Sequence, residues 1–173
     1  YLTAGITVIR KQPMIRGSIT LDLFAVLLGG ATALLPIFAK DIFQTDAFGL
    51  GLLRSATAVG AVAMSLAIVN FNFERRVGQR LFQSVALFGL ATIGFGLSTS
   101  FWFAFFFLVC LGAADMVSVF IRSALVQILT PDEMRGRVSA VNSMFIGASN
   151  ELGQFETGVL AHFTGAVAAV VIG

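Results

Sequence analysis

Long apolar stretches recur along this chain, and they constrain its fold more than any other feature. A segment needs about 20 predominantly apolar residues to cross the roughly 30 Å hydrocarbon core of a bilayer. Five such stretches are present, at residues 17–39, 49–70, 81–99, 101–122 and 138–161, and a sixth starts at about residue 165. The sequence therefore predicts an all-α membrane protein: a polytopic helical bundle with five complete transmembrane helices and the start of a sixth.

Composition agrees with this fold class and excludes several functions. The chain is 57% hydrophobic and only 12% charged, whereas soluble domains carry about 25% charged residues. The net charge of +2 gives no reason to expect a nucleic-acid partner. With one cysteine and one histidine, the chain offers neither a disulfide framework nor a metal-ligand spacing. No catalytic constellation is visible, so we expect neither an enzyme nor a metal site.

The basic residues predict how the bundle is oriented. Cytoplasmic connections are enriched in Lys and Arg. One set of alternating connections holds eight of these residues, namely Arg10, Lys11, Arg16, Arg75, Arg76, Arg80, Arg135 and Arg137. The opposite connections hold only Lys40. The chain is therefore expected to enter from the cytoplasm, with residues 1–16 as an amphipathic linker on the inner face and residues 17–173 as the bundle. Because Tyr1 is not an initiator Met, we expect a longer chain.

The connection "TPDEMRGR" carries a helix-start signature. Thr130 is a suitable N-cap, Pro131 suits the first helical position, and Glu133 completes a capping box. This pattern predicts that the fifth helix begins in the cytoplasm. Arg135 and Arg137 would then reach the headgroup layer. Whether they have a further role there or only set the topology of the chain is left open by the sequence.

Charged residues inside the predicted spans need an explanation, because a charge at mid-bilayer costs at least about 2.5–3.5 kcal/mol on insertion scales. Asp22 and Asp115 both fall in the inner half of their spans. Arg122 follows Asp115 by seven residues, which places the two on one helix face. We expect Asp22, Asp115 and Arg122 to form an inner-side polar cluster. Its role is either a proton-linked or substrate-contact site, or a salt bridge that joins two helices.

A second group of charges falls in the outer half. Arg54, Glu151 and Glu156 reach similar depths, so an ion pair from Arg54 to either glutamate is one possibility. The alternative is that Arg54 faces a part of the protein outside this sequence.

The two glutamates are predicted to face different surroundings. At 100° per residue they lie about 140° apart around the helix. Glu156 shares a polar stripe with Ser139, Asn142, Ser149 and Gly153, and we expect this stripe to line a water-accessible path. Glu151 shares a small-residue face with Ala140, Gly147 and Gly158, which favours close helix packing. We therefore expect Glu151 to be buried at a helix contact.

Short loop motifs and longer stretches together resemble a known family. Arg76, Gly78 and Arg80 match the R-x-G-x-R loop of major facilitator superfamily transporters, and Pro131, Arg135, Gly136 and Arg137 match its P-x-x-x-R-G-R loop. Arg75 stands where the family usually has an acid, so a charge relay is not implied. The stretches "LDLFAVLLGGATALLP", "LGAADMVSVFIRSALVQ" and "RGRVSAVNSMFIGASNELGQFE" resemble the branch of enterobactin exporters and macrolide-efflux-type pumps.

The resemblance implies the second half of a twelve-helix fold, with helices seven to eleven and the start of twelve. It also implies a secondary active transporter that exports a small molecule, such as a siderophore or drug, by alternating access. The proton gradient would supply the energy without a bound cofactor, in a bacterial inner membrane, and a six-helix N-terminal half would complete the substrate site. The pathway candidates are Asp22, Arg54, Asp115, Arg122, Asn142, Glu151 and Glu156. The alternative is a non-transporting scaffold or receptor-like bundle, which needs no acids at membrane depth.

Overall fold

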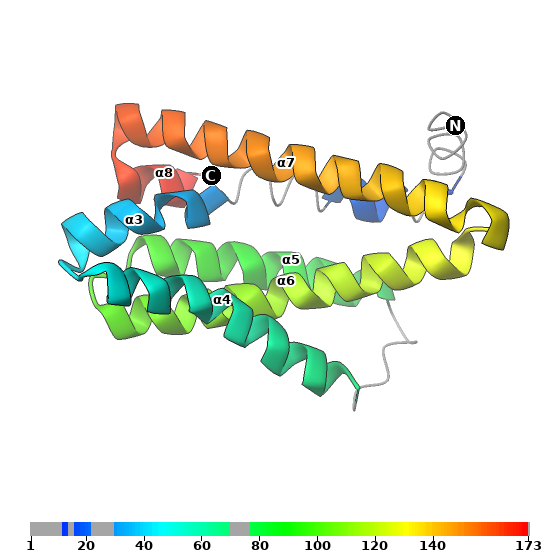
Figure 1. Ribbon diagram of the computed structural model, residues 1–173, viewed down its shortest axis with the longest axis horizontal. Helices are drawn as coiled ribbons and strands as arrows, with labels where there is room; N and C mark the ends of the chain where they lie inside the picture. Colours follow the sequence, from blue (N-terminus) through cyan, green and yellow to red (C-terminus); the bar gives the residue numbers. More distant parts are fainter. Residues whose placement is uncertain (1–11, 14–15, 22–29, 70–76, 173) are drawn as a thin grey trace.

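The computed structural model describes residues 12–13, 16–21, 30–69 and 77–172, and every regular element within them is a helix (Figure 1). In chain order these elements are η1 (Gly30–Leu34), α3 (Leu35–Ile37), η2 (Phe38–Ile42), α4 (Ala47–Ile68), α5 (Val77–Gly96), α6 (Phe101–Leu129), η3 (Asp132–Met134), α7 (Arg135–Thr164) and α8 (Ala166–Ile172). The predicted all-α class is confirmed for these residues. Much of the predicted linker 1–16, together with residues 22–29 of the first span, lies outside them.

The long helices fall where the apolar stretches predict them, with shifted ends. α6 begins at Phe101 as predicted but continues past Arg122 to Leu129, because the intervening residues are helix formers and Pro131 first interrupts them. α5 begins at Val77 rather than at residue 81, so Gly78 and Arg80 stand on its first turn and not in a loop. α7 ends at Thr164, and the C-cap residue Gly165 has a φ of 86°, which suits only glycine well.

Only α4 and α6, among the described helices, are both long and apolar enough to cross a bilayer by length and composition. The prediction of five complete spans is therefore not confirmed. For α5 and α7 the difference comes from polar residues within the helices, while residues 22–29 of the first stretch lie outside the described residues. α5 opens with Gln79, Arg80 and Gln83, and α7 carries Asn150, Gln154 and two glutamates.

Side-chain capping is present at the start of α4 and absent at the start of η3. At α4, the Gly49 amide donates to the Asp46 Oδ1 at 3.0 Å, which satisfies one of the free N–H groups of the first turn. The capping box expected at Thr130 is wrong. Pro131 instead precedes the 3-10 turn η3, and the buried Thr130 Oγ1 has no hydrogen-bond partner among the described residues.

Glycines set how closely the helices pack. α6 packs along both α4 and α5, while η1 packs on α7 and α8 reaches α5 (Figure 1). A Cβ at Gly60 of α4 would overlap the Val109 carbonyl of α6, and one at Gly112 of α6 would overlap the Thr57 carbonyl of α4. The backbones of the two helices therefore touch at this crossing. A Cβ at Gly30 of η1 would likewise overlap the Gly153 carbonyl of α7.

The buried core divides into two clusters near opposite ends of the bundle. The larger cluster centres on Phe38 and Phe95, whose ring centroids lie 4.6 Å apart, and includes Leu53 and Leu108. The smaller one consists of Ile19, Val126, Val138 and Val141. Because α6 contributes Leu108 to one cluster and Val126 to the other, its residues between these positions lie between the two apolar ends.

Large apolar side chains remain uncovered on the outside of the bundle. Trp102, Phe103 and Phe106 at the start of α6 are 71%, 67% and 59% exposed, and Phe155 of α7 is 72% exposed. A soluble monomer rarely leaves such an extended apolar surface in contact with water. A lipid environment accounts for it.

Candidate functional site: a polar cavity between helix pairs

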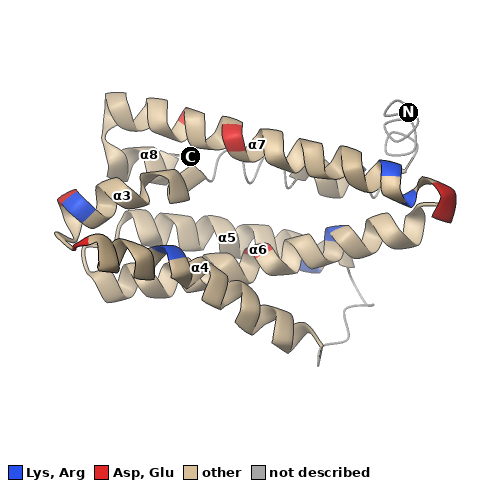
Figure 2. Ribbon diagram, in the orientation of Figure 1, with Lys and Arg blue, Asp and Glu red and all other residues tan. Residues whose placement is uncertain are grey.

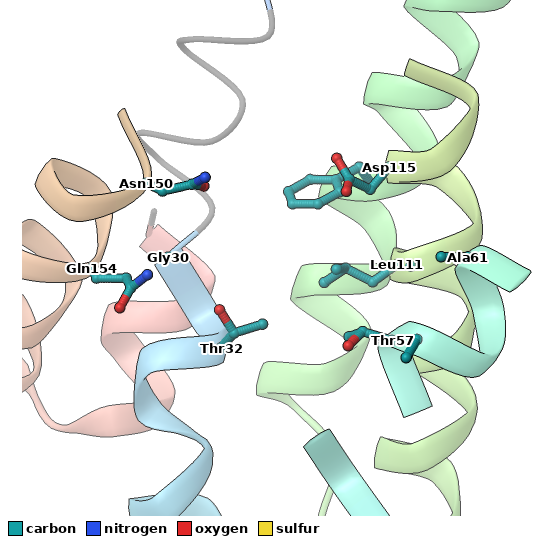
Figure 3. A pocket seen from close by; sticks show the side chains of 11 residues that line it. Gly30, Thr32, Thr57, Ala61, Leu111, Asp115, Asn150 and Gln154 are labelled. Carbon is teal, nitrogen blue, oxygen red and sulfur yellow. The ribbon is translucent and has the colours of Figure 1, made fainter. Parts of the chain in front are cut away.

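A cavity of about 340 Å³ lies between the two apolar clusters. η1 and α7 form one wall, while α4 and α6, with Phe88 of α5, form the other (Figure 3). Its lining residues are Gly30, Thr32, Thr57, Ala58, Ala61, Phe88, Leu111, Gly112, Asp115, Asn150 and Gln154. The volume falls at the low end of the 300–1,000 Å³ that small-molecule sites commonly occupy.

Polar groups reach the cavity from both walls. Asn150 and Gln154 lie on the α7 side beside Thr32, and Asp115 lies across from them above Leu111 (Figure 3). Among the described residues of the lining, Asp115 is the only charged one. Amide, hydroxyl and carboxylate groups in an otherwise apolar cavity are what fixes the orientation of a small polar ligand.

The geometry of α6 explains why Asp115 reaches the cavity. Asp115 follows Leu111 by four residues and Gly112 by three, and this spacing places the three residues on one face of α6. Arg122 stands two turns further on and is only 3% exposed, outside the lining. Asp115 therefore lies in the site and Arg122 does not line it. The third member of the predicted cluster, Asp22, lies outside the described residues.

On α7 the described surroundings of the polar stripe differ in part from those predicted. Asn142, Ser149 and Gly153 are buried, and Glu156 beside them is half-buried. Gly153 meets Gly30 of η1, so this part of the stripe is a packing surface, whereas Ser139 of the same stripe is exposed. The small side chains of the packed part let η1 approach, which is the physical reason for the difference.

The other face of α7 differs from its prediction as well. Glu151 is exposed, and a Cβ at either Gly147 or Gly158 would meet no atom within 4 Å. Within the described residues this face packs against no helix, so the predicted burial of Glu151 is not found. The two glutamates do occupy separate faces, as the helical period requires.

The possible ion pair of Arg54 is not formed within the described part of the chain. Arg54 is exposed on α4, and its carbonyl accepts the Thr57 hydroxyl at 3.1 Å. The contribution of Arg54 to the lining itself is therefore indirect, through the backbone that carries Thr57.

The P-x-x-x-R-G-R motif lies at the end of the bundle where α6 meets α7, and both acidic and basic residues are present there (Figure 2). Arg135 Nη2 lies 2.9 Å from Asp132 Oδ1, and its Nε donates to the Gln127 carbonyl at 3.0 Å. The side chain thus ties the last turn of α6 to η3. Pro131, Gly136 and Arg137 are exposed, with Arg137 Nη1 3.7 Å from the Met134 sulfur. Arg76 lies outside the described residues.

Four polar lining residues were missed by sequence reasoning: Thr32, Thr57, Asn150 and Gln154. The two amides stand four residues apart and therefore share a face. Two polar residues at this spacing inside an apolar stretch could have indicated a polar face on the helix. The two threonines gave none, because a threonine in a helix often bonds its own backbone, as Thr57 does.

The fold and this cavity define a helical membrane protein with a polar internal site. The sequence profile of the family described as transmembrane secretion effector matches residues 4–173, so the chain belongs to this family of major facilitator superfamily transporters. No curated protein and no solved structure matches the chain significantly. The predicted superfamily is confirmed, while its enterobactin-exporter and macrolide-efflux branch remains a prediction.

Proposed function

We propose that this chain is the C-terminal half of a secondary active transporter that exports a small molecule by alternating access. The observation that carries the proposal is the cavity, which places Asp115, Asn150 and Gln154 together between apolar ends. Polar and ionisable residues within the membrane commonly mark a substrate or ion pathway. The family description, secretion effector, supports export as the direction.

Proton coupling is the second part of the proposal. Asp115 is the acid placed to take up and release a proton beside a bound substrate, because it is the charged group of the cavity lining. Glu156, half-buried beside the η1 contact, and Glu151, on the exposed face, are secondary candidates. The proton gradient supplies the energy, so this mechanism needs no bound cofactor.

The architecture follows from the same proposal. In this proposal α5, α7 and residues 17–39 span the bilayer together with α4 and α6. A six-helix N-terminal half of the same protein completes the substrate site, and the whole lies in a bacterial inner membrane.

The test uses the full-length transporter in proteoliposomes that contain a pH-sensitive dye. Enterobactin, erythromycin and ethidium are offered under an imposed pH gradient, and substrate-dependent proton flux is recorded. We expect flux with at least one of them and a loss of at least about tenfold in Asp115→Asn. Asp46→Asn is the matched control, since Asp46 caps α4 outside the cavity and asparagine is an equally good cap.

Two results would decide against the proposal. Full flux in Asp115→Asn would remove this carboxylate from the coupling pathway. Absence of gradient-dependent flux with every substrate, in a protein that remains folded, would favour the non-transporting scaffold.

A further inference from the structure

Arg54 is a charged residue to which the proposed transport mechanism gives no role. It lies seven residues from the start of α4, roughly 10 Å along a helix that is long and apolar enough to cross a bilayer. Its side chain is exposed and makes no hydrogen bond or ion pair with any described residue. A charge at this depth is costly without a partner, so we expect a group outside the described residues to meet it.

The helical period shows which way Arg54 faces. The α4 residues that line the substrate cavity follow it by three, four and seven positions, namely Thr57, Ala58 and Ala61. At 100° per residue, all of them lie within about 60° of Arg54 around the axis. The exposed apolar residues Val59 and Leu66 lie about 140° and 120° away. Arg54 therefore stands on the cavity face of α4, one turn beyond the lining.

The opposite wall supplies hydrogen-bonding groups that carry no charge. Asn150 and Gln154 come from α7 and lie across the cavity from Thr57 and Ala61 (Figure 3). Each carboxamide has both N–H donors and a carbonyl acceptor. Neither side chain makes a hydrogen bond with a described residue, so both can bind the polar body of a ligand.

The acid of the cavity lies away from Arg54. The Thr57 carbonyl of α4 meets Gly112 of α6, and the two helices run in the same direction (Figure 1). Arg54 precedes Thr57 by three residues, whereas Asp115 follows Gly112 by three. Arginine and carboxylate therefore lie on opposite sides of this contact, and an anionic group at Arg54 does not have to approach Asp115.

We propose that Arg54 binds the anionic group of the transported molecule, so that the cavity takes an organic anion whose polar body reaches Asn150 and Gln154. A guanidinium holds a carboxylate or a similar oxyanion by paired, charge-assisted hydrogen bonds. Such a pairing is stronger beside apolar walls than in open water. The inference rests on the proposed transport function, because it assigns the charge of the substrate of that same site.

Equilibrium binding to the full-length transporter in detergent tests the inference without a pH gradient. The probes are fluorescein and tetramethylrhodamine methyl ester, which share a xanthene ring system and carry opposite net charges at mildly alkaline pH. Binding is followed by fluorescence anisotropy. We expect the parent to bind fluorescein and Arg54→Gln to bind it at least about tenfold more weakly, as the loss of a hydrogen bond to a charged group predicts. The affinity for the cationic dye should not fall.

Two further variants serve as controls. Lys40→Gln removes a basic residue of η2, shortly before α4 and outside the lining, and should leave fluorescein binding unchanged. Arg54→Lys keeps the charge but not the paired hydrogen bonds, so its affinity for fluorescein should lie between those of the parent and Arg54→Gln. If Arg54→Gln does not fold, Arg54→Lys and the two dyes still decide the result.

Four results would overturn the inference. Unchanged fluorescein binding in Arg54→Gln would mean that Arg54 meets a protein group, such as an acid of the N-terminal half. Equal weakening of both dyes would indicate a structural change, and an equal effect of Lys40→Gln would indicate summed charge alone. A parent that binds only the cationic dye, or neither dye, would reject the anionic class.

Failure of this inference is distinguishable from failure of the transport proposal. Fluorescein binding that depends on Arg54, in a protein without gradient-dependent flux, would keep the anion site and reject transport. Flux in a protein whose fluorescein binding does not depend on Arg54 would do the reverse.

Discussion

The crossing of α4 and α6 offers a quantitative test of the packing. Gly60 and Gly112 each face a backbone carbonyl of the other helix, those of Val109 and Thr57. A carbonyl in a helix does not move aside as a flexible side chain does. An alanine methyl at either position therefore forces the helices apart by roughly 1 Å or more before ordinary contact distances return.

Two opposing terms set the magnitude. Overpacking of this kind costs about 1–3 kcal/mol, and replacing a mid-helix glycine by alanine gains about 1 kcal/mol of helix propensity. Gly51 on α4 and Gly89 on α5 are matched controls, because a Cβ there would meet no atom within 4 Å. We expect Gly60→Ala and Gly112→Ala to lose about 0–2 kcal/mol relative to the parent, and Gly51→Ala and Gly89→Ala to gain about 1 kcal/mol.

The assay is thermal unfolding of the full-length transporter in detergent, followed by circular dichroism. At about 2–4 °C per kcal/mol for domains of this size, the test variants should melt several degrees below the controls. The double variant should cost less than the sum of the single ones, since one separation of the helices relieves both contacts. Test variants that melt at or above the controls would refute the proposed backbone contact at this crossing.

Two further predictions concern local contacts at helix ends. Asp46→Ala removes the acceptor of the Gly49 amide and should lower stability by about 1 kcal/mol, with Asp46→Asn near the parent; equal loss in both would show that the cap is not the cause. In a double-mutant cycle of Asp132→Asn with Arg135→Gln, the exposed pair should show a coupling of about 0.2–1 kcal/mol that falls with added salt, and a salt-independent coupling would contradict the ion pair.

Much of the fold was readable from the chain because helix formation in an apolar stretch depends mainly on local residues. The stretches at 49–70 and 101–122 correspond to α4 and α6, and the start of α6 at Phe101 was predicted to the residue. Errors concentrate at ends where polar residues join the helix, as at Gly78 and Arg80. The 3-10 turn at Asp132 was also missed, because the sequence fits a helix that is capped by Thr130 equally well.

The candidate site was only partly predictable. Asp115 could be identified from its charge and depth alone, since a carboxylate among apolar residues needs a function or a partner. Asn150 and Gln154 could be placed on one face by their spacing, but nothing local says which helix that face meets.

The sequence by itself determined the membrane class, the approximate positions of the helices α4 to α7, and which residues of α7 share a face, because these follow from composition and the 3.6-residue period. Only the tertiary structure decided what each face meets. Gly153 and Thr157 pack against η1 because Gly30 lies opposite them and offers no side chain. That contact leaves Asn150 and Gln154, rather than Glu156, to line the cavity, and Glu151 on the face that no described helix covers.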